Sequence, residues 1–171
     1  YLIKHKHWSP FEMVNMCVEI TTTRSIASQI LRHRSFSFQE FSQRYAQVND
    51  RPPILQPRRQ DTKNRQASHD DLDPFIVQDY QVKANLLYDH AYRLYQEMID
   101  NGIAKECARD VLPLSAPTRL YMNGTLRSWL HYTDLRSSNG TQLEHKLISD
   151  SVKDLILNHT PSIYEAYFNN N

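Results

Sequence analysis

The chain contains only three glycines, Gly102, Gly124 and Gly140, and this scarcity strongly limits the folds open to it. Rossmann folds and P-loops both need clustered glycines where backbone N–H groups approach phosphate oxygens. Glycines spaced this far apart exclude both kinds of nucleotide-binding loop. Any anion that this chain binds is therefore expected to be held by side chains.

Length and composition suit one globular domain. The chain has 171 residues, of which 40% are hydrophobic and 23% charged, and one domain usually takes about 100–200 residues. No run approaches the roughly 18 apolar residues that a membrane span needs. The two cysteines, Cys17 and Cys107, argue against a disulfide scaffold and fit a reducing compartment. Their apolar neighbours predict that both thiols pack in the interior rather than react.

The spacing of apolar residues, caps and prolines predicts the secondary structure. Strands are expected over 13–22 and 119–123, and helices over 25–32, 74–100, 104–110, 125–135, 142–158 and after Pro161. Thr23 is a possible N-cap of the first helix, and Asp73 is the expected N-cap of the long one. Residues 50–74 contain four prolines and are expected to form a polar loop, with room for short strands. We therefore expect one α+β domain over residues 1–171, with a small, mostly antiparallel sheet and helices packed on it.

Positive charge is concentrated in the N-terminal half of the chain. Between Arg24 and Arg65 there are nine basic residues and three acidic ones, a local charge of +6, whereas the whole chain carries +1. The segment 32–45 adds serines and three interleaved phenylalanines, and arginine forks match phosphate oxygens well. A solvated basic turn is the alternative for such a segment. We expect the phenylalanines Phe36, Phe38 and Phe41 to be buried and to draw their charged neighbours into a concave site.

The same segment carries a family resemblance. Arg32-His33-Arg34, seven residues and then Ser42 is similar to the signature of the flavin-dependent thymidylate synthases. Three other segments resemble that family in the same order, namely 5–12, 106–113 and 127–136. Together the four segments cover nearly the whole chain.

The resemblance implies an enzyme that converts deoxyuridylate (dUMP) to thymidylate (dTMP). It implies FAD as the hydride carrier, NADPH as the reductant of the flavin, and methylenetetrahydrofolate as the one-carbon donor. It also implies a cytoplasmic homotetramer with active sites between subunits, no membrane or nucleic-acid partner, and a strand–helix segment ahead of residue 1. We expect the natural protein to be longer than this chain for that reason.

The resemblance also assigns residues to ligands. Arg136 is the expected catalytic residue, because a guanidinium against the uracil edge would stabilise negative charge there without a covalent nucleophile. The expected dUMP contacts are Gln29, Glu40, Phe41, Ser42, Gln43, Arg44, Arg109 and Arg136. The expected FAD contacts are Ser9, Glu12, Arg32, His33, Arg34, Gln39, Arg127 and His131.

His7 is expected near the folate and nicotinamide, and no metal ligands are expected. We assign Ser42 to the substrate phosphate rather than to nucleophilic attack, since no histidine is obviously placed as its base. Arg127 and Arg136 lie nine positions apart, about 180° around an ideal helix, so they cannot easily serve the same pocket of one subunit, and we expect the site to form between subunits. The sequence departs from the family pattern at Gln39, Thr125, His131 and Gly140, which leaves the details of FAD contact open.

Two other functions remain open from the residues alone. The basic, aromatic-interleaved stretch could belong to a non-catalytic nucleotide or nucleic-acid phosphate-binding module, with rings stacking on bases. The nearly balanced overall charge argues against nucleic acid. A flavoprotein oxidase or reductase on the same scaffold is the second alternative, and the presence of Ser42 and Arg136 argues against it.

Overall fold

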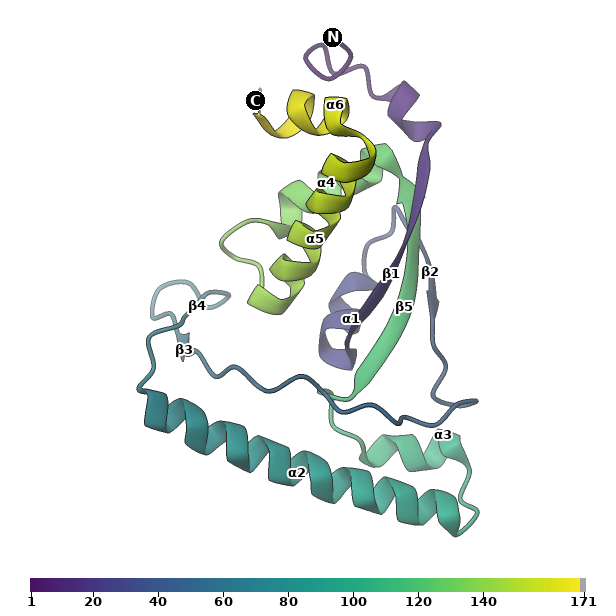
Figure 1. Cartoon of the computed structure of the whole chain (residues 1–171), viewed down its shortest axis with the longest axis vertical. Coiled ribbons are helices and arrows are strands. Elements are labelled where there is room, and N and C mark those ends of the chain that lie inside the picture. Colours follow the sequence, from purple (N-terminus) through teal and green to yellow (C-terminus); the bar gives the residue numbers. More distant parts are fainter. Residues whose placement is uncertain (170–171) are drawn as a thin grey trace. The chain divides into compact units, whose positions relative to one another are not determined.

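The computed structural model describes residues 1–169 (Figure 1). These residues divide into two compact units. The first unit comprises Tyr1–Ile20, Ile30–Gln39 and the chain from Tyr121 onward, and the second comprises Thr21–Gln29 and Glu40–Leu120. A three-stranded sheet has the order β1-β5-β2, with β1 at Asn15–Thr23, β5 at Pro117–Thr125 and β2 at Ser37–Glu40. The expected α+β class with a small antiparallel sheet is confirmed.

In the first unit, helices α4 (Leu126–Arg136) and α5 (Leu143–His159) pack against each other (Figure 1). A 3₁₀ turn, Ser9–Glu12, precedes β1, and α6 (Pro161–Tyr164) continues into one π-helical turn, Glu165–Asn169. The helices predicted over 125–135 and 142–158 are confirmed to within one residue. The short helix predicted after Pro161 is confirmed as well.

Local sequence explains where α4 begins and which side it buries. The Thr125 hydroxyl accepts a hydrogen bond from the Ser128 N–H at 3.2 Å, which caps the helix. Trp129 and Tyr132 are fully buried on one side of α4. The Trp129 indole N–H donates to the Met16 carbonyl at 2.9 Å and ties α4 to β1.

Gly124 in β5 is a site of close approach in this unit. A Cβ built on Gly124 would overlap Cδ1 and Cε1 of Phe36, whose ring packs edge-on against Trp129 with centroids 4.7 Å apart. We expect Gly124→Ala to lower the free energy of unfolding by about 1–3 kcal/mol, because the ring has little room to move. Urea unfolding would measure this, with Asn123→Ala at the exposed neighbouring position as the control. Equal stability of the two variants would contradict it.

Helix α1 (Arg24–Ile30) follows β1, and all of its residues except Ile30 belong to the second unit. The long helix α2 of this unit runs over Pro74–Asp100. The Asp73 carboxylate accepts from the Phe75 N–H at 2.8 Å, so the predicted cap and the predicted start at Pro74 are confirmed. Helix α3 (Lys105–Ala108) and a 3₁₀ turn, Arg109–Val111, pack against α2. Two short strands within the predicted loop, β3 (Arg59–Gln60) and β4 (Ser68–His69), pair antiparallel.

The core of the second unit forms where α2 meets α3. Tyr95 and Ala108 are fully buried, and Val48 is nearly so. The Tyr95 hydroxyl accepts from the Val48 N–H at 3.1 Å, so the buried phenol has a partner.

Three expectations about burial and helix length are wrong. Phe41 is 46% exposed rather than buried, because its backbone N–H is fixed by the Arg119 carbonyl at 2.8 Å and the ring lies against the Arg119 guanidinium. Both cysteines are free and exposed, Cys17 on β1 and Cys107 on α3. The first helix ends at Ile30 rather than at residue 32.

Within residues 1–169, no helix is long and apolar enough to cross a membrane.

Candidate active site

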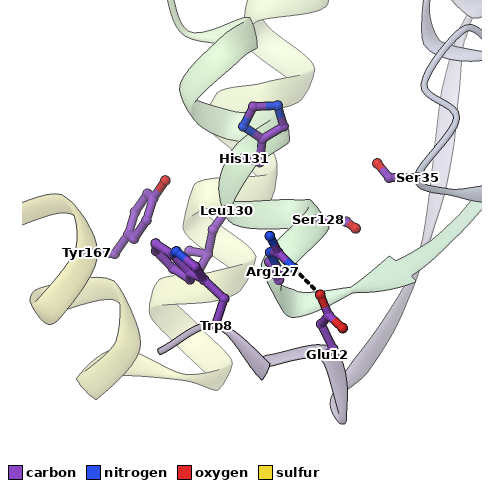
Figure 2. Close-up of a pocket in the computed structure, with 8 residues that line it drawn as sticks. All are labelled: Trp8, Glu12, Ser35, Arg127, Ser128, Leu130, His131 and Tyr167. Carbon is purple, nitrogen blue, oxygen red and sulfur yellow. Dashed lines mark hydrogen bonds and ion pairs between the residues drawn. The ribbon is translucent and has the colours of Figure 1, made fainter. Parts of the chain in front are cut away.

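The first unit contains a cavity of about 500 Å³ (Figure 2), a size usual for small-molecule sites. Three of its lining residues, Glu12, Arg127 and His131, belong to the expected FAD contacts. They come from the 3₁₀ turn before β1 and from α4, more than 100 residues apart in sequence. The complete lining is Trp8, Glu12, Ser35, Arg127, Ser128, Leu130, His131 and Tyr167.

The chemistry of this lining fits a flavin dinucleotide. Arg127, His131 and two serine hydroxyls can donate hydrogen bonds to phosphate oxygens and sugar hydroxyls. Glu12 forms an ion pair with Arg127, which holds the guanidinium against one side of the cavity (Figure 2). Trp8 and Tyr167 add aromatic surface, which suits a planar ring.

The sequence prediction missed five of the lining residues. Ser128 and Leu130 could have been found, because they lie beside Arg127 and His131 on the same helix. Ser35 directly follows the Arg-His-Arg motif, and Trp8 directly precedes the expected contact Ser9. Tyr167 lies far from every motif in the sequence, so only the folded chain brings it to the cavity.

His33 and Arg136 form the second arrangement in this unit. The Arg136 Nε–H donates to His33 Nε2 at 3.0 Å, which requires that ring nitrogen to be unprotonated. Burial is the main cause that lowers the pKa of His33 to about 4, with smaller effects from the nearby Arg136 and His131. Within residues 1–169 the two terminal amino groups of Arg136 form no hydrogen bond. Arg136 is thus oriented by a neutral imidazole and has its two outer donors available.

His33 is itself held by an aromatic cluster. Its ring lies edge-on to Tyr132, with centroids 5.0 Å apart. Tyr132 and the fully buried His145 share a hydrogen bond of 3.0 Å between the phenol oxygen and Nε2. Burial is the main cause that lowers the pKa of His145 to about 4, and burial also raises the pKa of Tyr132.

The remaining expected FAD and folate contacts of this unit lie on its surface. Their side chains are exposed and are not among the residues that line the cavity. These residues are His7, Ser9, Arg32, Arg34 and Gln39.

The second unit holds the expected dUMP contacts except Arg136. Residues 40–45 comprise the end of β2 and the loop that follows it, and both the start of β5 and α3 hold this segment in place. The Thr118 hydroxyl donates to the Glu40 carboxylate at 2.8 Å. Arg44 forms an ion pair with Glu106 of α3 at 2.9 Å. The Ser42 hydroxyl accepts from the Arg44 N–H at 3.4 Å.

Gln43 differs from its neighbours in this loop because it is buried, with 4% of its surface exposed. Its amide oxygen accepts from the Arg24 guanidinium. Its amide nitrogen donates to the Pro117 carbonyl at 3.3 Å. Both ends of the side chain are therefore bonded within the protein. The other two expected contacts, Gln29 and Arg109, are half-buried.

Ionisable side chains in the described chain do not gather into a metal site. Among residues 1–169 no group of three or more histidine, cysteine, aspartate or glutamate side chains could hold a metal ion. The arginine and serine side chains described above, together with the neutral His33, can bind anions and polarise carbonyl groups.

Both units thus present side chains typical of an α+β protein that binds nucleotides without a glycine-rich loop. The family model described as thymidylate synthase complementing protein matches residues 1–162. The chain is 51% identical over 166 residues to a probable flavin-dependent thymidylate synthase of Paramecium bursaria Chlorella virus 1. It is 48% identical over 166 residues to the flavin-dependent thymidylate synthase of Synechocystis. Each of these two matches covers 97% of this chain and 77% of the relative.

A third relative is more distant. The chain is 32% identical over 170 residues to the flavin-dependent thymidylate synthase of Dictyostelium discoideum, with 98% of this chain and 56% of the relative covered. This chain belongs to the thymidylate synthase complementing protein family. The family resemblance inferred from the sequence motifs is therefore confirmed. The alternative of a non-catalytic phosphate-binding module is not favoured.

Proposed function

We infer that this chain catalyses the reductive methylation of dUMP to dTMP, with methylenetetrahydrofolate as the carbon donor. It is a flavin-dependent thymidylate synthase that uses FAD and NADPH. The observation that carries this conclusion is the identity to enzymes of that name over nearly the whole chain. The convergence of Glu12, Arg127 and His131 on one cavity agrees with it.

We propose that the cavity of the first unit holds part of the FAD, with Arg127 and His131 as donors and Glu12 as the residue that orients Arg127. Once reduced by NADPH, the flavin held there would supply the hydride that reduces the transferred carbon. The exposed residues Ser9, Arg32, Arg34 and Gln39 are proposed as further FAD contacts, together with His33. His7 is proposed to contact the folate or nicotinamide.

For dUMP, we propose that Arg44 and Ser42 bind the phosphate, since a guanidinium and a hydroxyl are suitable donors. Glu40 is the proposed acceptor for a sugar hydroxyl. Gln43 is proposed to act by holding the loop, because its amide already bonds Arg24 and Pro117. The remaining dUMP contacts that we propose are Gln29, Phe41 and Arg109. Arg136 is the proposed group at the uracil ring.

We also propose that the enzyme is a homotetramer with active sites between subunits. The long helix α2 supports an interface, because it leaves large apolar side chains exposed to solvent. Phe75 is 82% exposed and Leu87 66%, and Tyr80 and Leu94 are exposed as well. Light scattering of the purified protein tests this proposal, and a monomer would exclude it. The free thiols suit the cytoplasm as the site of action.

Ser42→Ala distinguishes the two roles open to this hydroxyl. If Ser42 binds phosphate, the variant should raise the KM for dUMP by about tenfold, the effect of losing one hydrogen bond to a charged group. The kcat should change little, since the uracil ring is activated elsewhere. Steady-state kinetics would measure both constants, with Ser28→Ala on the exposed side of α1 as the control. Complete inactivity with normal dUMP binding would instead support a nucleophilic role.

The function itself is tested by the visible absorption spectrum, taken with and without dUMP, together with an assay for dTMP. Flavin bands near ~375 and ~450 nm that shift on addition of dUMP are expected if both ligands share one site. A colourless protein that takes up no FAD and forms no dTMP would overturn the proposed function.

A further inference from the structure

Trp8 and Tyr167 form an aromatic wall at one side of the cavity in the first unit (Figure 2). Their ring centroids lie 6.1 Å apart at an interplanar angle of 70°. Both side chains are half-buried. Each side chain therefore packs partly against the protein and partly lines the cavity.

Contacts outside the cavity hold both rings in place. Trp8 packs on the buried ring of Phe11, with centroids 6.0 Å apart. The Tyr167 hydroxyl donates to the carboxylate of Asp134 on α4. A ring fixed in this way loses little conformational entropy when a ligand stacks on it.

The other lining residues are mainly polar. Arg127 and His131 supply basic or donor groups, and Ser35 and Ser128 supply hydroxyls. A ligand that matches both parts of the cavity has a planar ring joined to an anionic or hydroxyl-rich group. Flavin dinucleotides have this chemistry, with two ring systems joined through a diphosphate.

We propose that Trp8 and Tyr167 are FAD-binding residues that stack on a planar ring of the dinucleotide. This inference rests on the proposed function. Tyr167 lies beyond residues 1–162, the part of the chain that the family model matches. The C-terminal turn Glu165–Asn169 therefore adds a ring contact to a cavity whose polar residues come from the matched part.

Isothermal titration of the full chain with FAD tests the proposal. Trp8→Leu removes the ring but keeps apolar bulk, and Tyr167→Leu does the same on the other side. Each should weaken FAD binding about tenfold or more, the effect usual for loss of one stacking partner. Trp8→Phe and Tyr167→Phe retain a ring and should bind within about threefold of the unaltered chain. Tyr121→Leu, at an exposed tyrosine of β5, is the matched control.

Two smaller ligands identify the ring. FMN carries the isoalloxazine without the adenine, and ADP carries the adenine without the isoalloxazine. A tenfold loss confined to FMN assigns the aromatic wall to the isoalloxazine, and a loss confined to ADP assigns it to the adenine. Circular dichroism and the melting temperature establish whether each variant is folded. If a leucine variant is not folded, the phenylalanine variant at the same position provides the comparison of ligand binding.

Unchanged binding of FAD, FMN and ADP by folded leucine variants would overturn the proposal. Weakened binding of methylenetetrahydrofolate alone would overturn it as well, because the wall would then serve a different ring. Failure of the unaltered chain to bind FAD at all would instead contradict the proposed function, so the two failures are distinguishable.

Discussion

Arg136→Ala is expected to slow dTMP formation by about 10²–10³-fold while FAD remains bound. The Arg136 guanidinium is oriented by the hydrogen bond from its Nε–H to His33, and its two outer amino groups are free of protein partners within residues 1–169. A donor fixed in this way stabilises negative charge that develops on the uracil ring without reorganisation. Removal of one such donor typically costs about 10²–10³-fold in kcat.

The measurement is single-turnover formation of dTMP together with the flavin absorption of the purified variant. Arg93→Ala provides the matched control, because Arg93 is an exposed arginine that donates to the Asp89 carbonyl of its own helix. Arg136→Lys should recover little activity, since an ammonium group lacks the planar pair of donors. Unchanged turnover of Arg136→Ala would remove the proposed role of this residue.

Acidification is expected to destabilise the protein between pH 6.5 and about 4. Burial lowers the pKa of His145 from 6.5 to about 4, with smaller effects from Arg136 and His33. In this window the unfolded chain binds a proton that the folded chain does not, so the free energy of unfolding falls as the pH falls. The contribution is fully present above pH 6.5. For the fully buried His145 it amounts to about 3 kcal/mol, a large part of the stability of a small domain.

The experiment is urea unfolding at intervals from pH 7.5 to pH 4.5. His145→Gln removes the titrating group while keeping a side chain that can bond the Tyr132 hydroxyl, so its stability should vary less over this range. His33 contributes in the same direction, but by less because it is half-buried. His90→Gln at an exposed position of α2 is the control. Equal pH dependence of His145→Gln and the unaltered chain would refute the assignment to His145.

Elements bounded by local signals were predicted closely from the sequence. Asp73 and Pro74 start α2 because a carboxylate cap and a proline at the first turn act within four residues. Thr125 starts α4 by a similarly local signal, since its hydroxyl caps the Ser128 N–H three residues on. The prediction was less accurate for α1, which ends at Ile30 although the helix was expected to continue to residue 32. No stop signal in the sequence marks this end.

The apolar row of α2 was predicted as helical spacing, and the helix is confirmed. Its burial was not determined by that spacing, since Tyr80 and Leu87 are exposed and only Tyr88 and Tyr95 are buried. Helical periodicity reports which residues share a face, whereas burial depends on what packs against that face.

The sequence by itself determined the family of this protein, the helix that carries Arg127 and Arg136, and the absence of any glycine-rich phosphate loop. Residue identity and short-range spacing are sufficient for each of these. Only the tertiary structure decided that Arg136 bonds a neutral His33, that Gln43 is buried against Arg24, and that Tyr167 reaches the cavity beside Trp8. Each of these depends on long-range packing, which sets the burial, the pKa and the partners of a side chain, and neighbouring residues in the sequence do not encode it.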